Sequence, residues 1–261
     1  MSKKIPPLFF LLLLHSLAQA DSVPGAAGSI EITTLLHAGV QLEYRGTVVQ
    51  VDPWDRLRLP DANPADLILI SDDPGHHLDV DAIERLRKPG ASVVLTAAGK
   101  QKWPDGIVVA NGETVRVAGV TVESIAAYDI IQGNPSHPKG DANGYVVTLG
   151  GKKFFFAGVT ECVDEVKALQ GIDVAFMPMN IPLARMTPAA AAACTLGLNP
   201  AVVYLYHYDQ DYARRAQQPD YVGTASLPDG LTVAESLDRF AEALDGSGIE
   251  FRRGEFYPPL G

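Results

Sequence analysis

The sequence predicts an α/β chain in which two β-sheets pack face to face and helices cover their outer faces. Two observations support this fold class. A run of short strands followed by helices and further strands occurs twice along the chain. Continuous apolar runs, such as the one at 67–70, are typical of strands that are buried on both faces. Because each apolar face must be buried against another layer, the pattern favours a layered sandwich.

The first half of the chain is expected to consist mainly of strands. Alternating or continuous apolar residues predict them at 30–32, 40–44, 48–51, 67–70 and 93–95. A polar loop at 71–79 follows the fourth of these strands. Ala82, Ile83 and Leu86 then recur at helical spacing, and Pro89-Gly90 is expected to end that short helix.

The second half is expected to repeat this arrangement. Strands are predicted at 114–117, 120–125, 145–149, 153–156, 174–177, 202–206 and 249–252. Helices are predicted at 163–169, 187–196 and 233–244. Thr187 followed by Pro188 is typical of a helix N-cap and the first helical position.

Composition and charge limit the class of partner. Hydrophobic residues make up 47% of the chain and charged residues 20%, a balance that excludes an intrinsically disordered chain. The net charge of −10 argues against a nucleic-acid partner, because binding phosphates requires clustered Lys and Arg. The sequence also lacks the G-x-S-x-G nucleophile elbow and the phosphate-binding G-x-x-x-x-G-K-[ST] motif.

Residues 1–20 have the pattern of a secretory signal. Lys3-Lys4 precedes an apolar run, and Ala18 and Ala20 place small residues at the −3 and −1 positions. We predict cleavage after Ala20, which leaves 21–261 as a single exported domain in the periplasm or outside the cell, with no stable membrane anchor. An uncleaved N-terminal anchor is the alternative.

Cys162 and Cys194 are the two cysteines of the chain. In an exported chain they can form a disulfide, and two buried free thiols fit the sequence equally well. Neither lies in a C-x-x-C motif, so the sequence assigns them no redox or metal chemistry.

Histidines and one aspartate are the candidate metal ligands, because zinc prefers imidazole and carboxylate donors. Most of them lie beside apolar strands, and loops at strand ends converge on one rim in α/β folds. The candidate ligands are Asp72, His76, His77, His137 and His207. His37, taken by itself, is more typical of a surface or core histidine.

A series of short motifs runs in order along nearly all of residues 21–261. They are His37-Ala38, Val51-Asp52-Pro53-Trp54, Ala65-Asp66-Leu67-Ile68-Leu69-Ile70-Ser71, His77-Leu78-Asp79, Ala127-Tyr128, His137-Pro138-Lys139-Gly140, Asn143-Gly144-Tyr145, Leu149-Gly150-Gly151-Lys152, Ala157-Gly158 with Thr160-Glu161, Ile172-Asp173-Val174-Ala175-Phe176, Pro178-Met179-Asn180 and Tyr206-His207-Tyr208. Together they resemble the metallo-β-lactamase superfamily, in the branch of small hydrolases related to ascorbate-phosphate lactonases. The resemblance implies an αββα sandwich of two mixed β-sheets with helices on the outer faces and a site at one edge of the sheets.

The metal-binding motif departs from the family pattern. Where the family has H-x-H-x-D-H, residues 72–77 read Asp-Asp-Pro-Gly-His-His, so that Pro74 replaces a ligand. Val159 stands where the family has a metal-bridging carboxylate. Two cations about 3.5–4 Å apart need a bridging anion, so a two-metal centre is not expected.

The resemblance and its departures together imply one divalent ion, with zinc favoured over iron or manganese. Its predicted ligands are His77 and His207 together with His76, and Asp72 and His137 are the alternatives for a further ligand. Asp72 is the candidate catalytic residue, which would orient the attacking water if it does not bind the ion. The candidate substrate-binding residues are Tyr128, Lys139 and Asn180. Asp52 and Asp79 either orient ligands or cap local turns.

The function predicted from these residues is that of an exported metal-dependent hydrolase with one metal ion. Its substrate would be a small-molecule ester, lactone, amide or phosphoester, attacked by a water that the metal activates. The alternative is a binding or scaffolding protein of the same fold that has lost its two-metal centre and its catalysis.

Overall fold

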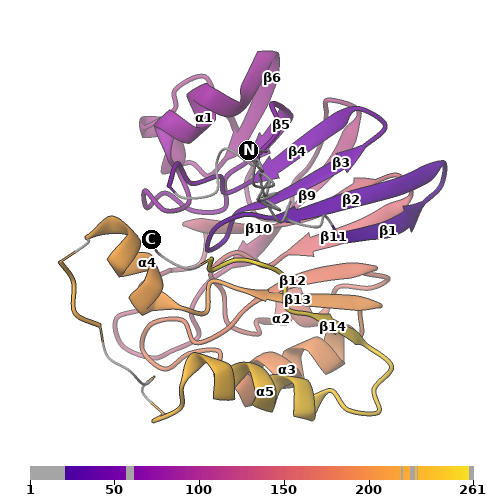
Figure 1. The fold of residues 1–261 in the computed structure, drawn as a ribbon. Coiled ribbons are helices and arrows are strands. Elements are labelled where there is room, and N and C mark those ends of the chain that lie inside the picture. Colours follow the sequence, from indigo (N-terminus) through magenta and orange to yellow (C-terminus); the bar gives the residue numbers. More distant parts are fainter. Residues whose placement is uncertain (1–20, 57–61, 219, 224–226, 228, 259–261) are drawn as a thin grey trace, which may run out of the picture.

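The computed structural model of the protein describes residues 21–56, 62–218, 220–223, 227 and 229–258. The predicted signal at 1–20 lies outside these residues. Within them, two seven-stranded sheets pack face to face, with helices on the outer faces, which confirms the predicted sandwich (Figure 1). No helix in the described part of the chain is long and apolar enough to cross a membrane.

The first sheet holds the strands of the N-terminal half in sequence order. They are β1 (Asp21–Gly25), β2 (Gly28–Thr34), β3 (Val40–Tyr44), β4 (Thr47–Val51), β5 (Ala65–Leu69), β6 (Arg87–Leu95) and β7 (Ile107–Val108). Strands β1 to β4 pair antiparallel, and β4 to β7 pair parallel. Helix α1 (Val80–Leu86) covers the outer face of this sheet, and a short 3₁₀ turn, η2 (Gly99–Gln101), precedes β7 (Figure 1).

The second sheet repeats that order of antiparallel and then parallel strands. Its strands are β8 (Thr114–Val117), β9 (Val120–Ala127), β10 (Ala142–Leu149), β11 (Lys152–Phe156), β12 (Val174–Pro178), β13 (Val202–Tyr206) and β14 (Glu250–Arg252). Pairing is antiparallel from β8 to β11 and parallel from β11 to β14. The helices of this half are α2 (Asp164–Lys167), α3 (Pro188–Leu198), α4 (Gln210–Gln217) and α5 (Val233–Ala243).

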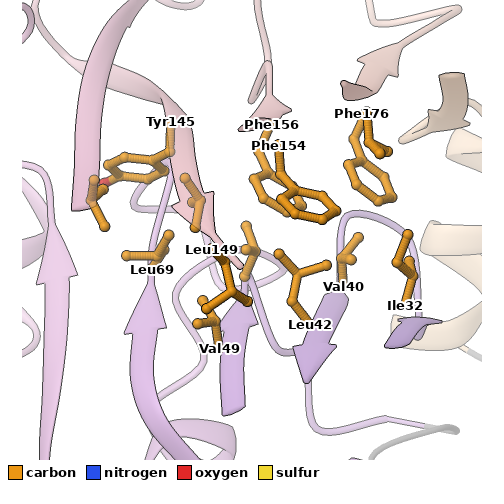
Figure 2. Packing of buried hydrophobic residues seen from close by; sticks show 14 of the residues in the cluster. Ile32, Val40, Leu42, Val49, Leu69, Tyr145, Leu149, Phe154, Phe156 and Phe176 are labelled. Carbon is orange, nitrogen blue, oxygen red and sulfur yellow. The ribbon is translucent and has the colours of Figure 1, made fainter. Parts of the chain in front are cut away.

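The core lies between the two sheets, and the alternation of side chains along each strand places it there. In β11, Phe154 and Phe156 enter the space between the sheets, whereas Phe155 packs in the cluster that lies beneath α3 and α5. Figure 2 shows Phe154 and Phe156 facing Val40 and Leu42 of the first sheet. Burying each such phenylalanine stabilises the fold by about 1.5–3 kcal/mol.

Two predicted helices differ from the observed ones. Helix α1 ends at Leu86, and Pro89-Gly90, the predicted helix stop, lies inside β6. Pairing between β5 and β6 shifts register between Ala65 and Leu67, so the irregular start of β6 accommodates Pro89, which has no N–H to donate. Helix α2 is shorter than the predicted 163–169. The short strands β1 and β7 and helix α4 were not predicted.

Thr187 and Pro188 act at the start of α3 as predicted. The Thr187 side chain accepts a hydrogen bond from the N–H of Ala190, and Pro188 is the first helical residue. Cys194 of the same helix forms a disulfide with Cys162, which precedes α2, over a Cα–Cα distance of 5.7 Å. The structure therefore decides between the two alternatives for the cysteines in favour of pairing.

Candidate metal centre

A pocket of about 560 Å³ opens at one edge of the sandwich. It is lined from the loops that follow strands of both sheets, together with one face of α4. Four histidines line it, namely His37, His76, His137 and His207. The topology explains this convergence, because both sheets direct the ends of their central strands to the same edge.

Three imidazoles form the centre of the site. Ligand nitrogens of His37, His76 and His207 all lie within 4.8 Å of one another. The rings of His37 and His207 are the closest pair, with centroids 3.9 Å apart. Nδ1 of His37 contacts the Tyr257 hydroxyl at 3.0 Å, whereas its buried Nε2 has no hydrogen-bond partner among the described residues. Nδ1 of His207 contacts the Gln210 side-chain amide, also at 3.0 Å.

Backbone strain accompanies the placement of these residues. His37, His207 and Asp52 adopt φ values of 60°, 54° and 42°, in the left-handed region that non-glycine residues rarely occupy. The N–H of His207 donates to the carbonyl of His37 at 3.0 Å, which joins the loop after β13 to the loop after β2. Such strained conformations persist where the surrounding structure holds them and are typical of functional sites.

His77 lies beside the three imidazoles and is held by a carboxylate. Its Nδ1 is 2.7 Å from Oδ2 of Asp52, and its Nε2 is 3.2 Å from Nε2 of His207. Asp52 also accepts hydrogen bonds from the N–H and hydroxyl of Ser71, at 2.7 and 2.5 Å. A histidine that donates one nitrogen to a carboxylate presents the other as a ligand, which is the usual arrangement at metal sites.

Burial keeps most of this cluster neutral. Burial and then the charges of neighbouring histidines hold the pKa values of His37 and His207 well below 6.5. The same causes lower the pKa of His76 to about 3, although the charge of Asp72 opposes them. Burial would also lower the pKa of His77, but the charge and hydrogen bond of Asp52 outweigh it and raise that pKa. The three neutral imidazoles have the protonation state that a metal ion requires.

His137 and Asp72 form a pair separate from the three-imidazole cluster. Nε2 of His137 lies 3.3 Å from Oδ2 of Asp72, and its Nδ1 lies 3.4 Å from Oδ2 of Asp129. The N–H of His137 also donates to that Asp129 oxygen at 2.9 Å. Asp129 forms a buried ion pair with Arg185. Burial favours the protonated form of Asp72, but the close approach of His137 and the charge of His77 lower its pKa overall.

The three predicted substrate-binding residues lie outside the described lining of the histidine pocket. Tyr128 donates to Glu165 at 3.0 Å, and Lys139 forms an ion pair with the same Glu165 while its Nζ lies 5.1 Å from the Tyr128 ring centroid. Lys139 and Glu165 line a different pocket. Asn180 lines a third pocket, and its φ is 53°.

Asp52 and Asp79, for which the sequence left two roles open, differ in what they contact. Asp52 contacts His77, as described above. Asp79 is the N-cap of α1, where its side chain accepts hydrogen bonds from the N–H groups of Asp81 and Ala82. Asp79 therefore caps a helix.

Pro74 and Val159 line the pocket, and neither offers a metal ligand. His37, by contrast, joins the cluster, although taken by itself it was expected to be a surface or core histidine. One signal pointed to it, because His37 stands directly before a predicted strand in a stretch that matched the family motifs.

Comparison with known proteins agrees with this architecture. Residues 31–207 match the model of the β-lactamase superfamily domain. A "UPF0173 metal-dependent hydrolase" from Thermus thermophilus is 29% identical over 228 residues, covering 76% of this chain and 96% of that protein. A crystal structure assigned as a metal-dependent hydrolase from Parabacteroides distasonis is 30% identical with a TM-score of 0.75, covering 91% of this chain and 98% of that one.

A more distant structure shares the fold alone. Igni18, a metallo hydrolase from Ignicoccus hospitalis, superposes with a TM-score of 0.64 at 19% identity, covering 88% of this chain and 96% of that one. The family match spans more than half of the chain, and the Parabacteroides relative is similar over nearly all of it. On the evidence of its two stacked sheets, its edge cluster of histidines and these matches, the chain belongs to the metallo-β-lactamase superfamily.

Proposed function

We propose that this protein is an exported metal-dependent hydrolase that uses one divalent ion, held by His37, His76 and His207. The observation that carries the proposal is the convergence of these three ring nitrogens within 4.8 Å of one another in an open pocket. The names of the Thermus and Parabacteroides relatives, both metal-dependent hydrolases, support the same class of activity.

The residues present fit a metal ion. The buried Nε2 of His37 has no hydrogen-bond partner among the described residues, an unsatisfied position that a metal would fill. Imidazole nitrogens are preferred ligands of zinc, so zinc is the ion that we propose, ahead of iron or manganese. His77 stands beside the three as a fourth ring that Asp52 holds in place.

One ion rather than two is proposed because the described lining of the pocket contains no bridging carboxylate, and its remaining histidine, His137, is already paired. Pro74 and Val159 occupy the pocket wall without a ligand atom, and Val159 is buried. Two neighbouring cations need a bridging anion to offset their repulsion. His137 and Asp72 pair with each other, and His137 is also held by Asp129.

A divalent ion in this position would supply Lewis acidity and lower the pKa of water, so that hydroxide would be available at neutral pH to attack an ester, lactone, amide or phosphoester. The chain's own residues would then manage protons. Asp72, whose lowered pKa favours its ionised form, would accept a proton and orient the water, and Nε2 of His137 at 3.3 Å would share that proton.

Export is supported by two features. The first is the signal-like pattern of residues 1–20. The second is the disulfide between Cys162 and Cys194, because such bonds persist in oxidising compartments such as the periplasm or the cell exterior.

The experiment that tests the function combines metal loading with a substrate screen. Mature protein would be stripped with a chelator, reloaded with zinc, manganese or iron, and assayed on matched aryl esters, lactones and phosphodiesters. We expect metal-dependent turnover that His76→Ala abolishes and that Asp79→Ala, the helix-cap variant, retains. Stoichiometric metal binding without turnover of any class would favour the non-catalytic binding protein instead.

A further inference from the structure

Helix α4 forms one wall of the histidine pocket. Gln210, Ala213, Arg214 and Gln217 all line it, and their i, i+3, i+4, i+7 spacing places them on one face of the helix. The neighbouring Arg215 lies off this face and lines the adjacent pocket instead. Arg214 lies on the ridge between the two pockets and borders both. The fold therefore presents one arginine of a consecutive pair to the histidines.

The described lining of this pocket is rich in hydrogen-bond donors and contains no carboxylate. Burial lowers the pKa values of three of the lining histidines, His37, His76 and His207, and so favours their neutral forms. Apart from the histidines, Arg214 is the one charged residue in the described lining of this pocket. The side-chain amides of Gln210 and Gln217 lie on the same helix face. The net charge of the chain is −10, yet the described lining of this pocket contains a cation and no acidic residue.

Arg214 lies on the same face of α4 as Gln210, which contacts the metal-site residue His207. Gln210 contacts both Nδ1 and the carbonyl of His207, at 3.0 and 2.8 Å. Arg214 follows Gln210 by four residues, which places it about 6 Å further along the helix axis. Its guanidinium carbon lies 5.7 Å from the centroid of the Tyr221 ring, and the Tyr221 hydroxyl donates to Asp211 at 3.0 Å. That tethered ring limits the directions in which the guanidinium can point.

We propose that Arg214 binds an oxyanion of the substrate, a carboxylate or a phosphate, in the wall of the histidine pocket. This inference rests on the proposed hydrolase function and names its substrate class, namely small acidic esters, lactones or phosphoesters. A guanidinium suits this role because its planar fork binds the two oxygens of such a group at once.

The first test uses two aryl esters that differ in one terminal group. Mono-4-nitrophenyl glutarate carries a free carboxylate, and 4-nitrophenyl pentanoate has the same chain length without it. For the zinc-loaded mature chain, we expect kcat/KM to be about 10- to 100-fold higher for the glutarate ester, the range of a charge-assisted hydrogen bond. Arg214→Ala should remove that preference through KM, so that the two esters are hydrolysed with similar kcat/KM. Arg215→Ala, the matched loss of one charge on the same helix, should keep it.

The second test measures binding without turnover. Calorimetric titration of the wild type, Arg214→Ala and Arg215→Ala with glutarate and with inorganic phosphate should show binding that only Arg214→Ala loses, and the tighter anion identifies the oxyanion. Equal kcat/KM for the two esters, or equal anion affinity in wild type and Arg214→Ala, would overturn the inference, as would equal losses in the two arginine variants. Binding that depends on Arg214 without cleavage of either ester would support the anion site and count against the hydrolase.

Discussion

Nδ1 of His77 lies 2.7 Å from Oδ2 of Asp52, and both side chains are only 1% exposed. The contact links Asp52, the residue directly after β4, to the loop that follows β5. It holds the His77 ring so that Nε2 meets Nε2 of His207 at 3.2 Å. The two sheets are therefore joined at their common edge through a carboxylate and two imidazoles.

Asp52→Asn tests whether this carboxylate supports the metal site. Asparagine tolerates the left-handed backbone conformation of Asp52. The substitution removes the negative charge of Asp52, which His77 contacts and which accepts hydrogen bonds from the N–H and the hydroxyl of Ser71. We expect the free energy of unfolding to fall by about 2 kcal/mol and the metal dissociation constant to rise about 10- to 100-fold. Urea unfolding and chelator competition measure the two effects.

The control for that variant is Asp79→Ala. It removes a helix cap, worth about 1 kcal/mol, at a residue that contacts none of the clustered histidines among the described residues. Metal affinity should stay unchanged. If Asp79→Ala weakened metal binding as much as Asp52→Asn does, general destabilisation would explain both results.

The stability of the metal-free protein should depend on pH because of its buried histidines. Burial and neighbouring charges hold the pKa values of His37 and His207 well below 6.5 and that of His76 at about 3. Below pH 6.5 the unfolded chain therefore binds protons that the folded chain does not, so the free energy of unfolding decreases as the pH falls. Each group contributes about 1.4 kcal/mol per pH unit. The raised pKa of His77 acts in the other direction only above pH 6.5, where its contribution is lost as the pH rises.

Urea unfolding of the metal-free protein between about pH 7 and about pH 5 measures this slope. His76→Gln should reduce it by the contribution of one group. A midpoint that stays constant over this range would show that the histidines are not buried as described.

Reduction of the disulfide should destabilise the fold without affecting the metal. Cys162 and Cys194 are 32 residues apart, and a loop of that length predicts a stabilisation of about 3–4 kcal/mol. The double variant Cys162→Ser/Cys194→Ser should unfold at a lower urea concentration than the oxidised wild type and bind the same amount of metal. Equal stability of the two proteins would contradict the pairing.

Restoring the missing donors should create a second metal site. Pro74 and Val159 both line the pocket near His137 and His76. Pro74→His/Val159→Asp supplies a ligand and a bridging carboxylate, so we expect the metal content to rise from about one to about two ions per chain. Val159→Asp alone should bind no additional metal, because the second ion would still lack its imidazole. A single variant that gained a full second ion would mean that His137 and Asp72 already suffice for that site.

Much of the fold could be predicted from the sequence, because strands buried on both faces leave a strong local signal. The apolar runs at 67–70 and 154–156 both fall on strands that the structure contains. The place of Pro89-Gly90 inside a strand could not be predicted from the sequence. A register shift between paired strands depends on the partner strand β5 and not on local residues.

The candidate site could be predicted only in part, because contacts between segments that are far apart in the sequence leave no local signal. His76 and His77 share one loop, and a cluster in sequence suggests a cluster in space. His37 reaches His207 only because the loops after β2 and β13 meet across the two sheets, a contact with no local signature. Tyr128 and Lys139 matched family positions, yet both bind Glu165, a partner that no spacing rule reveals.

The metal content of purified mature protein is the most direct test of a single ion held by His37, His76 and His207. Elemental analysis after dialysis would compare the wild type with His37→Ala and with His137→Ala. We predict about one ion per chain in the wild type and in His137→Ala, and loss of the ion in His37→Ala, because His137 pairs with Asp72 and Asp129 and lies outside the cluster. Retention of the ion in His37→Ala, or its loss in His137→Ala, would contradict the account.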